Sequence, residues 1–259
     1  MSESIKSKPG FKFLWSHQGM VHRLAVRLVN KVLALIPFKL KYLVALQMKK
    51  TQVPYSLVEG KTVVQIGAPY DTLNAGRSRG MMFSLMAGTG GRVLIIEPLQ
   101  ESVEEFRKRL VELNLENTTV FQSGAWSSKK ESVINVDVDH PATNFTGDTV
   151  DYTEERVSDF SKVKIQLDTV DNILSQSGFD KVDLISITTN WAEEEILQGM
   201  SEALRVGVKY VCLAYGKDGE DYKDLMNDLG YTSLSHDDRG VTYVRAQKAS
   251  DKLNEKSIV

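Results

Sequence analysis

Two segments of the chain carry residues that suit the binding of a nucleotide-like cofactor. Gly67 ends the apolar run 62–67, and Glu97 ends the next apolar run, 92–97. A glycine lets the backbone approach a ligand closely, and a carboxylate at the end of the following parallel strand can accept hydrogen bonds from two ribose hydroxyls. Glycine turns alone are common, so the pairing of Gly67 with Glu97 is what makes this prediction useful.

Alternating strands and helices from residue 62 onward would position these residues. We expect strands at 62–67, 92–97, 118–123, 182–187, 208–214, 230–235 and 241–246. We expect helices at 72–87, 100–113, 168–177, 191–204 and 219–229. Continuous apolar strands that alternate with amphipathic helices predict an α/β fold, in which a mostly parallel sheet is covered on both faces. A polar turn before the last strand predicts a hairpin, which makes that strand antiparallel.

The stretch 126–163 interrupts this alternation. It is polar and irregular, with a strand-like run at 132–138 and a loop at 140–147 that contains His140. Loops of this length in compact domains are usually functional or disordered. His140 is therefore one candidate for a catalytic base, although an exposed loop histidine without such a role is the commoner case.

The N-terminal segment differs from the rest of the chain in charge. Residues 4–58 contain ten lysines and arginines and no acidic residue, although the whole chain has a formal net charge of -2. Apolar residues recur with helical spacing at 19–35, and 38–48 shows a second, shorter amphipathic pattern. These helices either pack on the main domain or lie on an anionic membrane surface through residues 20–50. Nucleic-acid binding is the least favoured alternative.

Length and composition fit one large domain with an extension. We divide the 259 residues into a basic amphipathic helical extension at 1–58, a main domain at 59–247 and a disordered tail at 248–259. The single cysteine, Cys212, excludes an internal disulfide framework and fits a reducing compartment. The chain shows neither a signal-peptide pattern nor an apolar run of ~20 residues, so we expect a cytoplasmic protein, with peripheral membrane attachment as the alternative. The histidines show no metal-ligand spacing, so we expect no metal.

Several short motifs follow one another in an order that is typical of one enzyme family. Gln-Ile-Gly-Ala-Pro-Tyr-Asp ends the first strand, Gly-Gly-Arg-Val begins the second and Glu-Pro ends it; Gly-Ala-Trp-Ser follows the third, and Ala-Glu-Glu-Glu-Ile-Leu-Gln-Gly comes later. Together these motifs resemble the FkbM family of class I S-adenosylmethionine-dependent methyltransferases. The resemblance covers about 62–205 and implies a Rossmann-like, seven-stranded, mostly parallel sheet with an antiparallel last strand.

The chain departs from the family pattern at positions that carry charge. Gln65 stands where the family has its first-strand acid, Pro69 replaces an asparagine, and Asp71 replaces a glycine. After the fourth strand, the family's Lys-Ile-Asp-x-Glu-Gly becomes Ser-Ile-Thr-Thr-Asn-Trp. Two carboxylates at the catalytic edge are thus replaced by the neutral side chains of Thr188 and Asn190.

The resemblance implies a binding site for S-adenosylmethionine. Its cofactor-binding residues are Gln65, Gly67, Ala68, Asp71, Glu97, Gly124, Ala125 and Trp126. Glu97 is implied to bind the ribose, and Trp126 either stacks on the adenine or belongs to the core. Asp71 either compensates for the missing first-strand acid or only interacts with a helix dipole.

The same resemblance places three catalytic candidates, Thr188, Asn190 and Glu193, on the side of the methyl acceptor. Threonine and asparagine can orient a hydroxyl but deprotonate it poorly, and a general base helps when the acceptor is a hydroxyl. Glu193 is the nearest matching acid. It also lies in an acidic helix start, where the helix dipole is a sufficient reason for its presence.

Three functions are compatible with these observations. The resemblance implies methylation of a hydroxyl on a sugar or small molecule, with S-adenosylmethionine as the cofactor. The lost carboxylates favour a catalytically impaired methyltransferase-fold protein that serves as a binding or scaffold module. A nicotinamide-dependent dehydrogenase ranks lowest, because the turn 67–71 lacks the further glycines that a pyrophosphate needs.

Overall fold

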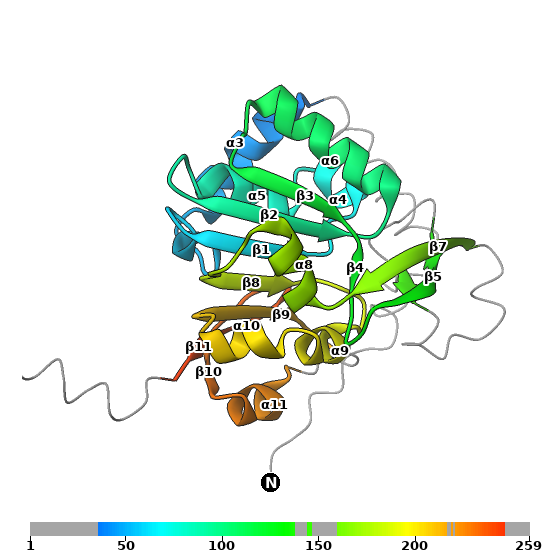
Figure 1. Cartoon of the computed structure of the whole chain (residues 1–259). Coiled ribbons are helices and arrows are strands. Elements are labelled where there is room, and N and C mark those ends of the chain that lie inside the picture. The colour runs from blue at the N-terminus through cyan, green and yellow to red at the C-terminus, as the bar shows by residue number, and fades with distance from the viewer. Residues whose placement is uncertain (1–35, 138–143, 147–159, 217–218, 220, 247–259) are drawn as a thin grey trace, which may run out of the picture.

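The computed structural model describes residues 36–137, 144–146, 160–216, 219 and 221–246. A seven-stranded sheet forms its centre, in the strand order β10-β11-β9-β8-β1-β2-β3 (Figure 1). The strands are β1 Thr62–Ile66, β2 Arg92–Glu97, β3 Thr118–Gln122, β8 Leu184–Ile187, β9 Tyr210–Ala214, β10 Tyr231–His236 and β11 Gly240–Arg245. Neighbouring strands from β3 to β9 are parallel, whereas β11 is antiparallel to β9 and β10. The predicted α/β class, with seven strands and an antiparallel last strand, is confirmed.

Helices cover both faces of this sheet (Figure 1). One face carries α3 Phe38–Lys49, the 3-10 helix η1 Tyr55–Leu57, α4 Tyr70–Asn74, α5 Arg79–Met86 and α6 Gln100–Leu113. The other face carries α8 Val170–Ser177, α9 Glu193–Gln198, α10 Ser201–Val206 and α11 Lys223–Asp228. Strands β1, β2 and β8 are buried along almost their whole length. Helices on both sides exclude water from these strands, which explains their continuous apolar runs.

The helix predicted at 72–87 is wrong in one respect, because the structure breaks it into α4 and α5. The chain turns at Gly76, which has a φ of +74°. Ser78 then caps α5, since its hydroxyl accepts a hydrogen bond from the backbone N–H of Met81. A glycine inside a helical pattern was compatible with one continuous helix, but here it provides a left-handed residue that ends α4.

The helix predicted at 191–204 is also broken, into α9 and α10, at Gly199. A Cβ atom at Gly199 would collide with the backbone carbonyl of Trp126. Close packing against a distant loop therefore fixes this position, and helical periodicity does not reveal it. The helix predicted at 219–229 is shorter than expected, because α11 occupies only Lys223–Asp228.

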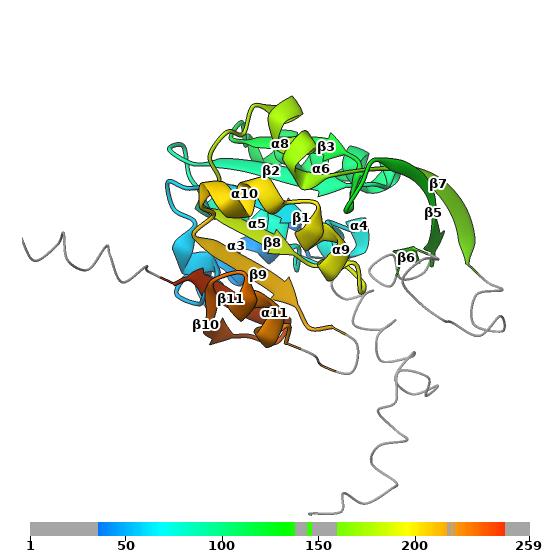
Figure 2. The same cartoon turned by 60° about the horizontal axis from the view of Figure 1, so that its bottom comes forward.

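A smaller second sheet stands where the sequence predicts an irregular stretch. Its strand order is β4-β7-β5-β6, with β4 Gly124–Ala125, β5 Lys130–Val136, β6 Phe145–Thr146 and β7 Ser161–Asp168. Figures 1 and 2 show the β5–β7 pair projecting away from the main sheet. The strand-like run at 132–138 is confirmed by β5, but the interpretation of 126–163 as otherwise irregular is wrong at its end, where β7 begins at Ser161. The first half of β7 is exposed, but Val163, Ile165 and Leu167 alternate with polar residues, which is a strand signal that the interpretation as an irregular stretch overlooks.

Helix α3 packs on the main domain through one of its faces. The hydroxyl of the buried Tyr42 donates to the backbone carbonyl of Leu73 at 2.9 Å. The predicted helix at 38–48 is confirmed, whereas the helix predicted at 19–35 and the tail at 248–259 lie outside the described residues. Tyr42 shares one hydrophobic core with the strands of the main domain. The domain boundary at residue 58 stays a prediction.

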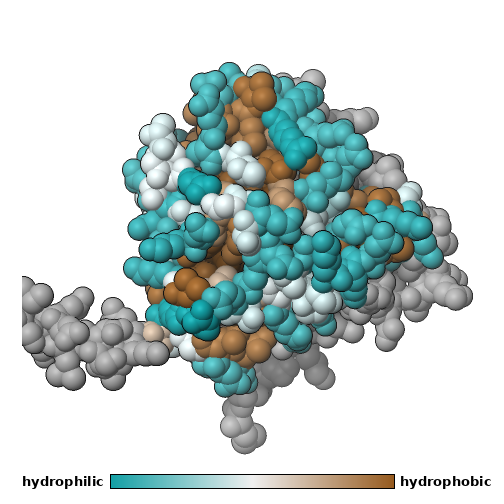
Figure 3. Space-filling model, in the orientation of Figure 1, coloured by the Kyte–Doolittle hydropathy of each residue, from teal (hydrophilic) through white to brown (hydrophobic). Residues whose placement is uncertain are grey.

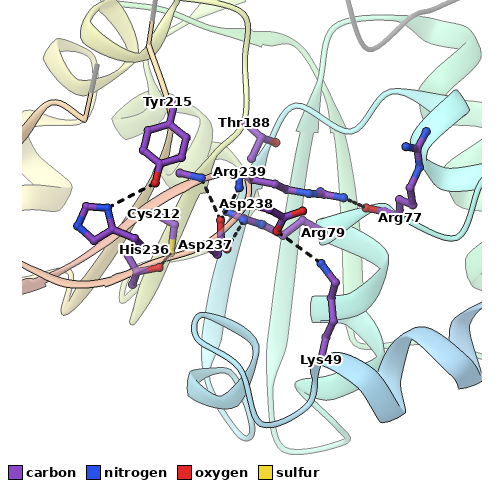
Figure 4. A network of polar contacts seen from close by, with 12 residues as sticks. Lys49, Arg77, Arg79, Thr188, Cys212, Tyr215, His236, Asp237, Asp238 and Arg239 are labelled. Atoms are coloured by element: carbon purple, nitrogen blue, oxygen red, sulfur yellow. Dashed lines mark hydrogen bonds and ion pairs between the residues drawn. The ribbon is translucent and has the colours of Figure 1, made fainter. Parts of the chain in front are cut away.

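Polar contacts join the start of α5 to the β10–β11 hairpin (Figure 4). Arg79 is buried, and its Nη2 donates to Asp237 Oδ2 at 2.8 Å. Arg239 Nη2 donates to the backbone carbonyl of Arg77 at 2.7 Å. The hairpin at one edge of the sheet is therefore held against the start of α5 and the loop that joins α4 to α5.

Candidate functional site

The carboxyl ends of β1, β2 and β8 border a cavity that the second sheet closes from the other side. The main sheet contributes Gly67, Glu97 and Thr188, and the second sheet contributes Ile165 and Leu167. The chain order of the strands reverses between β1 and β8. Ligands of open α/β sheets bind at such a reversal, outside the carboxyl ends of the strands. The cavity therefore lies where the fold predicts a binding site.

Glu97 is a buried carboxylate on the wall of this cavity. Its Oε2 accepts a hydrogen bond from the N–H of Ala68 at 2.7 Å, and its Oε1 accepts one from the N–H of Leu99 at 3.1 Å. Burial raises the pKa of Glu97 to about 7; the two N–H groups counteract this shift, and the charge of Asp71 adds to it. Each carboxylate oxygen has a second lone pair, so Glu97 can still accept hydrogen bonds from a ligand.

The backbone conformation and the packing of the protein require a glycine at position 67. Gly67 has a φ of +84°, and a Cβ atom there would collide with the backbone carbonyl of Thr188 at the end of β8. Gly67 also lines the cavity, so both the turn and the close approach of a ligand require a residue without a side chain at this position. Ala68 acts through its backbone, because its N–H binds Glu97 while its methyl group is buried in the core.

Gln65 lies behind the turn and not on the described cavity wall. The two N–H groups on its Nε2 are shared among three acceptors, namely the carbonyl of Ile66 at 2.8 Å, the carbonyl of Gly67 at 2.9 Å and Thr188 Oγ1 at 2.7 Å. Its Oε1 is buried and has no hydrogen-bond partner among the described residues. The amide therefore holds the turn that follows β1 against Thr188, which follows β8.

Asp71 lies in the first turn of α4, outside the described cavity lining. Its Oδ1 accepts a hydrogen bond from the N–H of the next residue, Thr72, at 2.7 Å. An acid at this place interacts favourably with the helix dipole. This contact favours an interaction of Asp71 with the helix dipole over compensation for the missing first-strand acid. Its influence on the cavity is electrostatic, through the raised pKa of Glu97.

Gly124, Ala125 and Trp126 all line the cavity. A Cβ atom at Gly124 would collide with the side chain of Leu167, so this glycine lets β7 approach. Trp126 packs with the apolar residues of the second sheet, and Lys130 Nζ lies 4.8 Å from the centre of its ring. Trp126 thus belongs to a small core and forms a cavity wall at the same time.

Two of the three catalytic candidates line the cavity. Thr188 Oγ1 accepts the hydrogen bond from Gln65, and Asn190 Nδ2 donates to the backbone carbonyl of Asn144 at 2.6 Å. Asn144 precedes β6, so Asn190 connects the edge of the main sheet to the second sheet. Both candidates are held in place by other residues, which suits a role in orienting a ligand.

Glu193 is fully buried, and the described cavity lining does not include it. Its Oε1 accepts hydrogen bonds from the N–H and the hydroxyl of Thr189, and its Oε2 accepts one from the Tyr222 hydroxyl at 3.3 Å. Burial raises the pKa of Glu193, although these hydrogen bonds oppose the shift. These contacts give Glu193 a local role, because they tie the loop after β8 to the start of α11.

Sequence reasoning misses the apolar half of the cavity. Ile134 from β5 and Ile165 and Leu167 from β7 form this wall, together with Asn144 and Thr146. The strand-like run at 132–138 is a signal for Ile134. The alternation of Val163, Ile165 and Leu167 with polar residues is a signal for β7, whereas its pairing with β5 across more than twenty intervening residues is not a local property. His140, the candidate base in the loop, lies outside the described residues.

The lining fits the nucleoside half of the cofactor that the resemblance implies. Glu97 keeps lone pairs for ribose hydroxyls, and Ile96, Leu99 and Trp126 offer apolar surface to a base. Glu97 is the one ionisable side chain among the described lining residues, so they provide no second carboxylate for an ammonium group. The cavity volume of about 100 Å³ is below the ~300–1,000 Å³ of typical ligand pockets.

One family of known proteins matches most of the chain. The model of the methyltransferase FkbM domain matches residues 65–232. No curated protein matches the chain. A solved FkbM methyltransferase from Methylobacillus flagellatus KT is similar, with 15% identity and a TM-score of 0.44 over 86% of this chain and 59% of that one. The chain thus spans less than two thirds of that protein's length.

Two further solved structures show a comparable, distant likeness. A SAM-dependent methyltransferase from Aquifex aeolicus has 15% identity and a TM-score of 0.40, over 84% of this chain and 94% of that one. The fibrillarin of Aeropyrum pernix, solved with natively bound S-adenosyl-L-methionine, has 12% identity and a TM-score of 0.41, over 78% of this chain and 72% of that one.

Proposed function

The chain belongs to the FkbM methyltransferase domain family, and from this premise we propose that it methylates a hydroxyl group of a sugar or of another small molecule. S-adenosylmethionine is the cofactor, and when bound it supplies the activated methyl group. The observation that carries the proposal is Glu97, a buried carboxylate at the end of β2 that lines the cavity and keeps lone pairs for ribose hydroxyls.

Orientation of the acceptor is the contribution that the described residues can make to methyl transfer. Thr188 Oγ1 receives a hydrogen bond from Gln65, and its second lone pair can accept one from the acceptor hydroxyl. Asn190 is fixed by Asn144 and borders the same space. Holding the reacting atoms in line can supply a large part of the rate. Glu193 then supports this edge from behind through Thr189 and Tyr222.

Calorimetry with three ligands tests the cofactor half of this proposal. S-adenosylmethionine and S-adenosylhomocysteine should bind, and NAD should not. Glu97→Ala should abolish binding, because it removes the acceptor for the ribose hydroxyls. Glu193→Gln is a matched control, since Glu193 is an equally buried acid away from the described cavity wall. It should leave the affinity unchanged, and the melting temperatures of both variants report their folding.

A second candidate function is a catalytically impaired methyltransferase-fold protein that binds a ligand or a partner. The specific observation in its favour is that Glu97 is the one ionisable side chain in the described lining, and both its oxygens are already engaged with backbone N–H groups. Removal of the acceptor proton would then need a base from elsewhere. Cofactor binding without turnover on a panel of hydroxylated acceptors would favour this candidate, and methylated product would exclude it.

A further inference from the structure

The outward face of α3 carries four large apolar side chains. Leu40, Leu43, Val44 and Met48 are between 49% and 68% exposed. Leu40, Leu43 and Val44 recur at the spacing that places side chains on one side of a helix. The opposite side of α3 is also apolar and packs into the core through Tyr42 and its neighbours. A helix that is apolar on both sides has a second surface to shield from water.

Lysines border this outward face and are available to a partner. Lys39 and Lys50 are exposed at the two ends of α3, on one flank of the apolar strip. Lys41 and Lys49 turn toward the protein instead. Lys41 Nζ donates to the backbone carbonyl of Asn74 at 2.7 Å, and Lys49 Nζ lies 5.4 Å from the centre of the Tyr55 ring. Helix α3 itself carries no acid, since residues 4–58 contain none, and the nearby acid Asp238 is paired with Lys49, whose Nζ lies 3.9 Å from Asp238 Oδ1.

We propose that this face, which we call the α3 surface (Leu40, Leu43, Val44 and Met48 with Lys39 and Lys50), docks on an anionic lipid bilayer. Apolar side chains of an interfacial helix enter the boundary between headgroups and acyl chains, while its lysines bind anionic headgroups. No helix in the described part of the chain is long and apolar enough to cross a bilayer. Docking through the α3 surface is a peripheral contact, with α3 parallel to the membrane plane.

The charge of the α3 surface favours a bilayer over the most direct alternative occupant, a second copy of this chain. In a two-fold dimer the same surface meets itself, so Lys39 and Lys50 of one copy would approach the same lysines of the other. The strip offers no carboxylate to pair with them. An anionic bilayer instead neutralises the lysines and covers the apolar side chains. The inference concerns attachment of the protein and does not depend on the methyl-transfer reaction.

Vesicle sedimentation with the full chain tests this proposal. Vesicles of phosphatidylcholine with phosphatidylglycerol should retain the protein at low salt, and vesicles of phosphatidylcholine alone should retain it poorly. Leu43→Glu should reduce retention by more than about tenfold, because it removes an inserted side chain and adds repulsion. Lys39→Gln and Lys50→Gln should each reduce it about fivefold, the value that ~1 kcal/mol per basic residue implies.

Val206→Glu is the matched control for Leu43→Glu. Val206 lies on α10, on the other face of the sheet, and is 58% exposed compared with 59% for Leu43. Figure 3 shows the side of the molecule that carries α10, where apolar and hydrophilic surface are mixed. Both variants add one negative charge at an equally exposed apolar site. Val206→Glu should therefore change retention less than about twofold.

Three outcomes would overturn the proposal. Equal retention of Leu43→Glu and the unchanged chain would mean that α3 does not touch the vesicle. Loss of self-association in Leu43→Glu, measured by sedimentation equilibrium, without vesicle binding would identify a second copy as the occupant. A lower melting temperature of Leu43→Glu than of Val206→Glu, with vesicle retention unaffected, would mean that another part of this chain covers the face.

Discussion

Replacing Glu97 with glutamine should change how the stability of the protein depends on pH. The ordinary pKa of a glutamate is 4.5, and burial raises the pKa of Glu97 to about 7. Between these two values the folded protein holds a proton on Glu97 that the unfolded chain has released. Stability therefore decreases as the pH rises through this interval, because the folded state binds more protons than the unfolded state.

The two pKa values fix the size of this effect. One unit of pKa corresponds to ~1.4 kcal/mol, so the free energy of unfolding that Glu97 contributes should fall by on the order of 3 kcal/mol between pH 4.5 and pH 7. Glu97→Gln removes the titrating group, while its amide oxygen can still accept a hydrogen bond from Ala68 or Leu99. The free energy of unfolding of the unchanged protein minus that of the variant should therefore decrease across this interval.

Urea unfolding of both proteins at a series of pH values provides the measurement. Other titrating groups contribute equally to the two proteins and cancel in the difference. Asp71→Asn is an informative control, because the charge of Asp71 helps to raise the pKa of Glu97. That variant should shift the midpoint of the effect to lower pH. A difference between the unchanged protein and Glu97→Gln that stays constant from pH 4.5 to 8 would refute the reasoning.

Three further variants test contacts around the site. Gly67→Ala should lower the free energy of unfolding by on the order of 2 kcal/mol in urea, because its φ is positive and its Cβ would meet the carbonyl of Thr188; unchanged stability would contradict this packing. Arg79→Met should lower it by on the order of 3 kcal/mol, because the partly buried Asp237 loses its partner, and Asp237→Asn in the same background should recover part of the loss. Thr188→Val should reduce methyl transfer about tenfold with the cofactor Kd unchanged, since it removes only the proposed acceptor contact; an equal loss in cofactor affinity would place Thr188 on the cofactor side.

The main sheet could be predicted because local signals and global fold agree there. Continuous apolar runs over β1, β2 and β8 reflect burial on both faces, which sequence displays directly. The buried position of Cys212 follows from the same pattern, and burial raises the pKa of its thiol to about 11. Gly67, Glu97 and Thr188 meet at one cavity for the same reason, since parallel strands bring their carboxyl ends to one edge of the sheet.

Features that depend on distant contacts could not be predicted in the same way. Position 199 requires a glycine because the carbonyl of Trp126 lies against it, and the pairing of β5 with β7 joins segments on either side of a long loop. The burial of Glu193 could not be predicted from local sequence patterns either. An acidic helix start suggested a catalytic or dipole role, whereas burial against Thr189 and Tyr222 is a tertiary property.

The two neutral residues nearest the turn, Gln65 and Thr188, form one hydrogen-bonded unit. Gln65 and Thr188 occupy positions where the family pattern has acids, and in this chain Gln65 Nε2 lies 2.7 Å from Thr188 Oγ1. Carboxylates at both positions would bring two negative charges together beside the carbonyls of Ile66 and Gly67, which raises the cost of ionising either one. The two N–H groups of the glutamine are instead shared between both carbonyls and the threonine hydroxyl. The geometry of the turn around Gly67 is thus kept by neutral groups, while the charge that could attract an ammonium group is given up. Cofactor binding then depends on Glu97 and on the fit of the cavity, which is why the Glu97 variants distinguish a working site from a remnant of one.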